Sequence, residues 1–386
     1  MARSDKTSRD IFIMVTNNCN LKCTYCYEGV KDKRKMEVSN IQPILQKEID
    51  SQKSKFKEFF VVFHGGEPFM AYKELKQVSE WLWNKYPELS IKCLTTTNGT
   101  VINSEMKNWM IVNKNRFVPI LSIDGTAESH DKNRPGSYHR IDKEFFLKHW
   151  PWQEVKMTIS PETLPTLVDN FIHLRQLGFK VNPSLAKEVQ WNLKKDLKTY
   201  AIEMHKLGNY FLENPDEKPC QLIDISLSDL SPLKNLPFNR ACGAGSDIIT
   251  YDVSGNAYPC HAFIGDPTLP YNKASIDQTF SLLNTNNGGK ISPNCKNCQL
   301  YTICSPCYGL NYASRKDMGK FDPQICEFNK ITVIASANMY ARMFSDPKKY
   351  VALSDKSKED FYLMASGIKH VLNTIKLPDF EQASIV

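Results

Sequence analysis

Three closely spaced cysteines near the start of the chain are the residues most able to do chemistry. They are Cys19, Cys23 and Cys26, so the spacing is C-x3-C-x2-C. Four thiolates would close a tetrahedral cage around zinc or complete the ligands of a [4Fe-4S] cluster. Three thiolates leave one metal position open for a ligand that reacts. A zinc site completed by a distant residue, or plain structural thiols, would show the same triplet, so its context has to separate these alternatives.

The triplet resembles the signature of the radical S-adenosylmethionine (radical SAM) superfamily, C-x3-C-x-aromatic-C, with Tyr25 as the aromatic residue. The resemblance implies a [4Fe-4S] cluster held by Cys19, Cys23 and Cys26, whose fourth iron chelates the amino and carboxylate groups of S-adenosylmethionine (SAM). It also implies reductive cleavage of SAM to a 5′-deoxyadenosyl radical that takes hydrogen from a substrate. The cofactor carries this step, and the protein holds it and excludes side reactions.

Length and composition are those of an ordinary globular protein. The 386 residues are 41% hydrophobic and 24% charged, which allows a large core and predicts two domains. No apolar run has the length of a membrane span and residues 1–6 lack the core of a signal peptide, so we expect a cytoplasmic protein with no membrane partner. Twelve cysteines in such a chain indicate metal rather than disulfides.

The formal net charge of +7 favours an acidic partner only weakly. The densest basic run covers residues 31–35, and we interpret it as a solvated loop. Nucleic-acid binding would need a basic face with interleaved aromatic residues, and the sequence shows none, so we expect no nucleic-acid partner.

Six short apolar runs alternate with helical patterns in the first half of the chain. The runs cover 11–15, 59–63, 91–95, 118–123, 155–159 and 179–183. Each is rich in β-branched or aromatic residues, as buried parallel strands are, and the alternation predicts an α/β fold. Between them, Ile41, Leu45 and Ile49 mark one helix face with Ser39 as its candidate cap, and Gly178 is a candidate C-cap. The resemblance makes this a partial (β/α)6 radical SAM barrel, with its chemistry beyond the carboxyl ends of the strands.

Further segments that resemble the family follow the predicted strands. Gly65, Gly66, Glu67 and Pro68 match the GGEP motif, which implies contact with the amino group of SAM, and glycine lets a backbone approach a ligand closely. The resemblance places Tyr25 near the adenine. The other implied SAM contacts are Asn98, Ser122, Asp124, Arg134 and Thr158. Arg134 is a candidate for a carboxylate of SAM or of the substrate, and a surface salt bridge is its alternative.

Seven cysteines in the second half form another pattern, C-x12-G-x4-C, then C-x2-C-x5-C-x2-C, then a final cysteine. The pattern resembles the SPASM extension of radical SAM enzymes, which usually has three residues where two separate Cys304 from Cys307. The resemblance implies two auxiliary [4Fe-4S] clusters, three clusters in all. One would be held by Cys295, Cys298, Cys304 and Cys326. The other would be held by Cys242, Cys260 and Cys307, with Cys220 as a fourth ligand or with an open site; zinc ribbons are the alternative.

The predicted organisation is a barrel over residues 1–215, a bridging segment over 216–235, a SPASM domain over 236–330 and C-terminal helices over 331–386. Within it we expect a β-hairpin over 251–260 and helices over 331–344 and 356–374. A small hairpin between clusters has little apolar core, so metal would supply much of its folding free energy.

The resemblance predicts an enzyme that modifies a peptide or protein. The leading hypothesis is a maturase that installs a thioether or carbon–carbon crosslink in a ribosomally made peptide. An anaerobic sulfatase maturase, which makes formylglycine, is the alternative, and it is disfavoured because His261 follows Cys260 where those enzymes have Asp. His261 is itself a candidate to move a proton.

The expected partners are a peptide or protein substrate and a flavodoxin- or ferredoxin-type electron donor. The first predicted strand begins by residue 11, so we expect no preceding leader-binding domain and recognition by the barrel mouth, the extension or a separate leader-binding protein. A non-catalytic iron–sulfur electron-transfer protein and a zinc-dependent nucleic-acid binder remain as alternatives from other classes.

Overall fold

The structure is a computed structural model that describes residues 8–28, 31–234, 242–264, 295, 298–304 and 307–376. All six predicted strands are present, each shifted at its ends by a few residues. They are β1 (Ser8–Thr16), β2 (Glu58–Gly65), β3 (Ser90–Thr97), β4 (Phe117–Leu121), β5 (Glu154–Ile159) and β6 (Lys180–Leu185). The helices between them are α1 (Val38–Gln52), α2 (Tyr72–Lys85), α3 (Ser104–Val112), α4 (Ala127–Asn133), α5 (Lys143–His149) and α6 (Leu167–Gln176).

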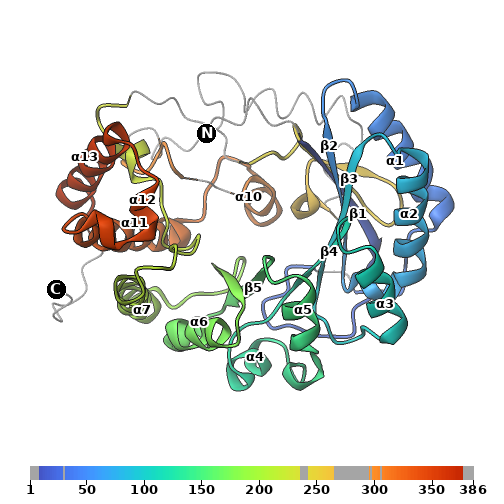
Figure 1. The fold of residues 1–386 in the computed structure, drawn as a ribbon, viewed down its shortest axis with the longest axis horizontal. Helices are drawn as coiled ribbons and strands as arrows, with labels where there is room; N and C mark the ends of the chain where they lie inside the picture. The colour runs from blue at the N-terminus through green and yellow to red at the C-terminus, as the bar shows by residue number, and fades with distance from the viewer. Residues whose placement is uncertain are drawn as a thin grey trace.

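The strands form an open, largely parallel barrel. One sheet has the order β4-β3-β2-β1 with parallel pairing throughout, and β5 and β6 form a second parallel pair. The two parts meet where Ile123 N donates to the carbonyl of Lys156 (2.9 Å). Figure 1 shows the strands as an arc with α1, α2 and α3 outside it. The predicted partial barrel is confirmed, and its carboxyl edges face one common side.

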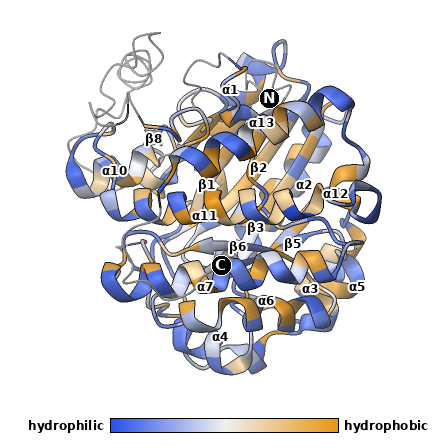
Figure 2. Ribbon diagram, turned by 90° about the vertical axis from the view of Figure 1, so that its left-hand side faces the viewer, coloured by the Kyte–Doolittle hydropathy of each residue, from blue (hydrophilic) through white to orange (hydrophobic). Residues whose placement is uncertain are grey.

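The local sequence explains most of these elements. Ile41, Leu45 and Ile49 of α1 are fully buried against the sheet, and Figure 2 shows this division of apolar inner and polar outer helix faces. The predicted cap of α1 is wrong, because the helix begins after Glu37 and Ser39 lies inside it. Gly178 follows the end of α6 with φ of 101°, the left-handed conformation that glycine adopts most easily, so that prediction is confirmed.

The extension contributes two strands to the same sheet. The predicted hairpin is present as β7 (Ile248–Tyr251) and β8 (Ala257–Tyr258), and its turn is held by Asp252 Oδ1, which accepts from Ser254 N (2.8 Å) and Asn256 N (2.9 Å). The sequence did not predict that β7 pairs with β1 in parallel, with Asp10 opposite Ile248. The edge of the barrel beside β1 is therefore covered by the extension.

At the far end of the arc lie α7 (Leu193–Glu213), α11 (Pro323–Met343), α12 (Val351–Ser354) and α13 (Lys358–Thr374) (Figure 1). The helix α10 (Tyr308–Arg315) lies apart from them, in the middle of the molecule (Figure 1). The predicted helix over 331–344 is real but begins earlier, because Asp322 caps it and Pro323 opens it. Cys326 thus lies in its first turn, and the predicted domain boundary at residue 331 falls inside it. The predicted domain ranges stay a prediction.

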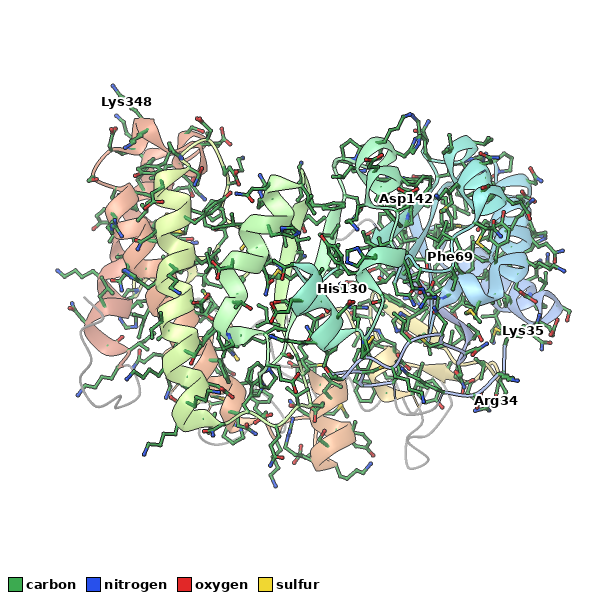
Figure 3. All side chains as sticks on the ribbon, turned by 90° about the horizontal axis from the view of Figure 1, so that it is seen from below. Arg34, Lys35, Phe69, His130, Asp142 and Lys348 are labelled. Carbon is green, nitrogen blue, oxygen red and sulfur yellow. The ribbon has the colours of Figure 1, made fainter. Side chains whose placement is uncertain are left out.

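The surface features agree with a loop role for the basic run. Figure 3 shows Arg34 and Lys35 at the margin of the molecule, whereas His130 lies in its middle. The Arg34 side chain is 58% exposed and pairs with its neighbour Asp32. Among the described helices, none combines the length and the apolar composition needed to cross a bilayer.

Candidate active site

The loop that carries the first three cysteines leaves the carboxyl end of β1 and is tied down on both sides. Thr16 Oγ1 accepts from Asn18 N (3.0 Å) and donates to the carbonyl of Arg34 (2.8 Å). Farther along, Thr24 N donates to the carbonyl of Asn133 at the end of α4 (2.9 Å). The loop is therefore held by the fold itself, at the edge of the sheet where the sequence predicted it.

The three thiols of this loop lie near one another and face one cavity of about 520 Å³. Burial raises the pKa of Cys19 and of Cys23, and the neighbouring Cys26 adds to both shifts. Two cations oppose this effect, Lys31 at Cys19 and Arg134 at Cys23. We call the space bounded by these cysteines, the strand ends and Cys307 the cysteine cavity.

Most of the predicted site residues line the cysteine cavity. Besides the three loop cysteines they are Tyr25, Gly65, Gly66, Glu67, Asn98, Ser122, Arg134, Thr158, His261 and Cys307. Pro68 and Asp124 are buried behind the wall instead of forming it. One cavity thus gathers the barrel residues that the resemblance assigned to SAM with two residues of the extension.

The two glycines after β2 are required by a close approach of two chains. A Cβ at Gly66 would lie 2.5 Å from the carbonyl oxygen of Asn18, and one at Gly65 would lie 2.1 Å from that of Thr16. The backbone amides use this proximity, since Gly66 N donates to Thr16 O (3.0 Å) and Glu67 N donates to Asn18 O (2.8 Å). The Gly-Gly segment therefore packs directly on the root of the cysteine loop.

Glu67 braces the wall of the cavity. Its carboxylate is almost fully buried and accepts hydrogen bonds from Thr97 Oγ1 (2.8 Å), Asn98 N (2.8 Å) and Phe69 N (3.2 Å). Burial raises the pKa of Glu67, and the three donors act in the opposite direction. The carboxylate connects the end of β2 to the end of β3, while Asn98 reaches on to Asn20 of the cysteine loop (2.9 Å).

Asp124 has a similar role on the other side. Its Oδ2 accepts from Tyr25 Oη (2.7 Å), Arg134 Nε (2.9 Å) and Asn133 Nδ2 (3.2 Å), and its Oδ1 accepts from Thr158 N (2.8 Å). All these bonds are internal, so Asp124 positions the lining residues and does not face the cavity. The guanidinium of Arg134 also lies 5.4 Å from the centre of the Tyr25 ring. Although burial opposes its charge, Asp124 outweighs that effect and raises the pKa of Arg134.

Sequence reasoning missed the residue that supports Asp124. His130 is fully buried, and its Nδ1 accepts from Asp124 N (3.1 Å) while its Nε2 lies 2.8 Å from Ser137 Oγ. The Ser137 hydroxyl donates to the carbonyl of Arg134 (2.6 Å), so it accepts from the histidine and fixes the neutral tautomer. Burial lowers the pKa of His130 to about 4. The only sequence signal was its place four residues before Arg134, which the resemblance assigned to a carboxylate.

Four side chains in contact with one another, Tyr27, Glu28, His64 and His261, form one part of the cavity lining. The rings of His64 and His261 have centroids 4.7 Å apart, and His64 Nε2 lies 3.2 Å from Glu28 Oε1 and 3.4 Å from Tyr27 Oη. Burial, together with His64 and Lys187, lowers the pKa of His261 to about 3, and its Nδ1 has no hydrogen-bond partner in the described part of the chain. His64, Glu28 and Tyr27 were not predicted as site residues, although His64 directly precedes the two glycines.

The cysteines of the extension fall into two groups with the predicted membership. Cys242 and Cys307 both lie near Cys260 and, after burial, are the main causes that raise its pKa. Cys295, Cys298 and Cys326 lie near Cys304, whose pKa burial raises to about 12. Cys307 is the member that reaches the cysteine cavity, and together with Cys304 and Cys326 it also lines a second cavity.

The structure does not bring Cys220 to the first of these groups. Its side chain packs into the main hydrophobic core near Tyr200 and Tyr340, and burial raises its pKa to about 12. Cys242 and Cys260 belong to a different, smaller apolar cluster. Completion of that cysteine group by Cys220 is therefore not supported by this placement.

Comparisons with known proteins agree with this arrangement. The family described as a 4Fe-4S single cluster domain matches residues 9–141. A cysteine-type anaerobic sulfatase-maturating enzyme of Clostridium perfringens is 23% identical over 75% of this chain and 85% of its own length, and one of Clostridium novyi is 24% identical over 84% and 96%. These matches support a radical SAM protein with a SPASM-type extension, as the sequence predicts.

Solved structures of radical SAM enzymes share the fold. The enzyme anSMEcpe with bound AdoMet has a TM-score of 0.67 at 19% identity, covering 92% of this chain and 98% of its own. SuiB of Streptococcus suis, bound to its precursor peptide SuiA, has a TM-score of 0.56 at 17% identity, covering 82% and 75%. These likenesses confirm the α/β architecture and the terminal helices.

The residues of the cysteine cavity fit the cofactors of a radical SAM enzyme. In the described residues, no three Cys, His, Asp or Glu side chains converge as tightly as a single metal ion requires. A [4Fe-4S] cluster spreads its ligands around a cage, so three thiols that share one cavity wall suit it better than they suit zinc. The volume is in the range of small-molecule sites, and Arg134 places a cation in it for a carboxylate.

Proposed function

We propose that this enzyme carries out a two-electron oxidation of a residue within a peptide chain. The observation that supports it is the cysteine cavity, into which thiols of the barrel loop and Cys307 of the extension both open. A substrate residue in this cavity lies between the site of SAM cleavage and a second cysteine group. The neighbours anSMEcpe and SuiB were both solved with peptides bound, which supports a peptide substrate.

The proposed cofactors are SAM and three [4Fe-4S] clusters. The first would be held by Cys19, Cys23 and Cys26, and together with SAM it supplies the radical that abstracts hydrogen. The others would be held by the two cysteine groups of the extension, Cys242, Cys260 and Cys307 and Cys295, Cys298, Cys304 and Cys326. Since Cys220 lies elsewhere, we propose an open or exchangeable position in the group that contains Cys307.

The protein residues position the reactants and shield them from water. Glu67 and Asp124 hold the walls of the cavity through internal hydrogen bonds, so the lining does not reorganise when the site fills. Arg134 offers its guanidinium to a carboxylate, and Tyr25 lies against it as a flat apolar surface. Both act before the chemical step, by binding and orienting.

The electron and proton balance limits the product. Loss of a hydrogen atom, followed by loss of one electron and one proton, oxidises the peptide by two electrons. A thioether or carbon–carbon crosslink has this balance, and so does formylglycine, formed from Ser directly or from Cys after hydrolysis. A crosslink is our leading proposal; formylglycine is the second, because the sulfatase-maturating enzymes match over most of the chain.

Two histidines of the cavity lining, His261 and His64, are candidates to accept the proton that the substrate loses. The predicted role of His261 stays part of the proposal, since its Nδ1 has no partner among the described residues. His64 has an equal claim, because Glu28 orients its ring. A flavodoxin- or ferredoxin-type donor and a separate leader-binding protein complete the proposed set of partners.

The test begins with anaerobic reconstitution of the enzyme with iron and sulfide, followed by reduction. Release of 5′-deoxyadenosine from SAM is expected, and its absence from an iron-loaded enzyme would refute the proposal. Mass spectrometry of a peptide encoded beside the gene, after co-expression, should show loss of two hydrogens for a crosslink. Conversion of a Cys or Ser to formylglycine would instead select the second candidate.

A further inference from the structure

Basic side chains outnumber acidic side chains in the lining of the cysteine cavity. Arg134 is paired with Asp124, and Lys31 lies by the cysteine loop, where it donates to Leu21 O (3.1 Å). The two remaining cations of the lining, Lys156 and Lys187, have no ion pair within the described part of the chain.

The acidic side chains of the lining are already occupied by other groups. Glu67 is buried among three donors of the protein, and Glu28 faces His64. Neither is bonded to Lys156 or Lys187. The two lysines therefore meet a substrate as unneutralised ammonium groups.

Lys156 points into the barrel because of the alternation of β5. Val155 and Met157 are buried on the outer face of this strand, which turns Lys156 to the inner face. Its carbonyl accepts from Ile123 N (2.9 Å), so the backbone beneath the side chain is fixed to the neighbouring strand.

Lys187 stands where the barrel meets the extension. It follows β6, and the next residue, Glu188, has a left-handed φ of 57°, which is costly for a residue with a side chain. This conformation is held by α10, since the Glu188 carboxylate accepts from Ser314 Oγ and lies 3.8 Å from Arg315. The extension thus fixes the backbone that presents Lys187.

A second cavity adjoins the cysteine cavity at Lys187. It has a volume of about 390 Å³ and is lined in part by Arg315 and Asp322, and it shares Ser184, Lys187 and Cys307 with the cysteine cavity. Lys187 lines both spaces and lies at their junction. A chain threading from one cavity to the other passes this ammonium group.

The two lysines are not placed to balance the thiols of the cysteine loop. The cations that act on Cys19 and Cys23 are Lys31 and Arg134. Lys156 and Lys187 are on the opposite strands, β5 and the end of β6. Their charge is directed at what lies across the cavity from the loop.

We propose that the substrate is an acidic peptide, with an Asp or Glu side chain close to the reacting residue that pairs with Lys187 and Lys156. This inference rests on the proposed function and adds the charge of the substrate to it. Both lysines are exposed to solvent, so the pairing would act by long-range attraction that salt screens. The pairing fixes how far the chain enters and so which residue meets the radical.

The experiment compares two fluorescent peptide pools on the reconstituted enzyme with SAM. Both have a central Cys and flanks drawn from Ala, Gly, Ser and Asn, and in the second pool Asp replaces Asn. The acidic pool should bind about tenfold tighter by fluorescence anisotropy at low salt, and the preference should shrink as salt rises. Equal binding of the two pools by the wild-type enzyme would overturn the inference without any variant.

Variants of Lys187 and Lys156 test whether these two residues cause the preference for the acidic pool. Lys187→Gln should lower it about threefold or more and Lys187→Arg should restore it, while Lys156→Gln combined with Lys187→Gln should abolish it. Lys148→Gln combined with Lys198→Gln removes the same charge at exposed positions away from both cavities and should leave the preference intact. A control that lowers the preference as much as the cavity variant would show a net-charge effect and refute the site.

Measuring the release of 5′-deoxyadenosine by the wild-type enzyme separates a failure of the acidic-substrate inference from a failure of the proposed function. Release without a preference for the acidic pool removes only the substrate inference. Absence of release from the iron-loaded enzyme removes the proposed function, whichever pool binds.

Discussion

The two cysteine-bearing regions of this enzyme are supported in different ways. The loop of Cys19, Cys23 and Cys26 is fastened by backbone hydrogen bonds to the end of α4 and to the Gly65–Glu67 segment, and Tyr25 within it packs against the main core. In the extension, Cys242 and Cys260 belong to a small separate apolar cluster that also includes Phe263, Tyr308 and Met318. The fold therefore preforms the barrel side of the cavity, and we expect the extension side near Cys260 to depend on bound metal for much of its stability.

Cysteine replacements give the largest expected contrast between the two regions. Cys23→Ala should reduce the release of 5′-deoxyadenosine to background, because the remaining two thiols cannot hold the SAM-binding cluster. Cys307→Ala should retain this release and lose the modified peptide. Chromatography of the nucleoside and mass spectrometry of the peptide measure the two outcomes.

Cys93→Ala serves as the control, since Cys93 is buried in β3 and faces neither cavity. It should keep both the release and the peptide product. Loss of nucleoside release in the Cys307 variant as severe as in the Cys23 variant would contradict the division into two regions.

Removal of iron should have the next largest effect, because it should make the extension, but not the barrel, sensitive to protease. After chelation, trypsin should cut rapidly after Arg315 and Lys316 at the end of α10, since this helix rests on the small cluster. Lys85, at the end of α2, should stay protected because that helix packs on the main core. Timed digestion with mass spectrometry checks this, and equal cutting at both places would mean that the barrel also needs metal.

Asp124→Asn tests whether the barrel side is held by its internal hydrogen bonds. The change leaves the Arg134 charge buried without its partner, which should lower the free energy of unfolding by about 3–5 kcal/mol. Affinity for SAM should fall as well, because Tyr25 and Arg134 lose their common anchor. Thermal unfolding and isothermal titration measure the two effects.

Glu128→Gln is the matched control for that variant. Its ion pair with Lys132 is exposed and screened by solvent, so its loss should leave the free energy of unfolding nearly unchanged. An Asp124 variant no less stable than this control would show that the buried hydrogen bonds do not hold the wall.

The smallest expected effect is a pH dependence of the same wall. The folded-state pKa of His130 is about 4, below the ordinary value of 6.5, so the fold favours the neutral ring. The corresponding stability is fully present above pH 6.5 and is lost as the pH falls towards 4, by roughly 3 kcal/mol. Denaturant unfolding at several pH values should show this loss in the wild type and not in His130→Gln, with His205→Gln, an exposed position, behaving as the wild type.

Most of the barrel could be predicted from the sequence because its strands are short apolar runs whose order is their order in the sheet. The cysteine loop and the two glycines could be placed for the same reason, since each directly follows a strand. The pairing of β7 with β1 could not be predicted, because it joins residues far apart in the chain whose local pattern shows only a hairpin.

The direction in which a polar side chain faces was also beyond the sequence. Asp124 was expected to contact SAM, and its type and position suit that role, but four internal donors turn its carboxylate away from the cavity. His64 and Glu28 meet only because the cysteine loop returns over the end of β2. The early start of α11 was missed because Cys326 was interpreted only as a ligand.

The strand that the extension lends to the barrel bears on any attempt to divide the enzyme. A fragment ending near residue 215 would leave β1 with a free row of amides and carbonyls at the border of a largely apolar sheet. Such a border recruits strands from other molecules, so the fragment should self-associate instead of behaving as an independent unit. By pairing β7 with β1, the extension protects the edge of the strand that carries the cysteine loop from intermolecular pairing.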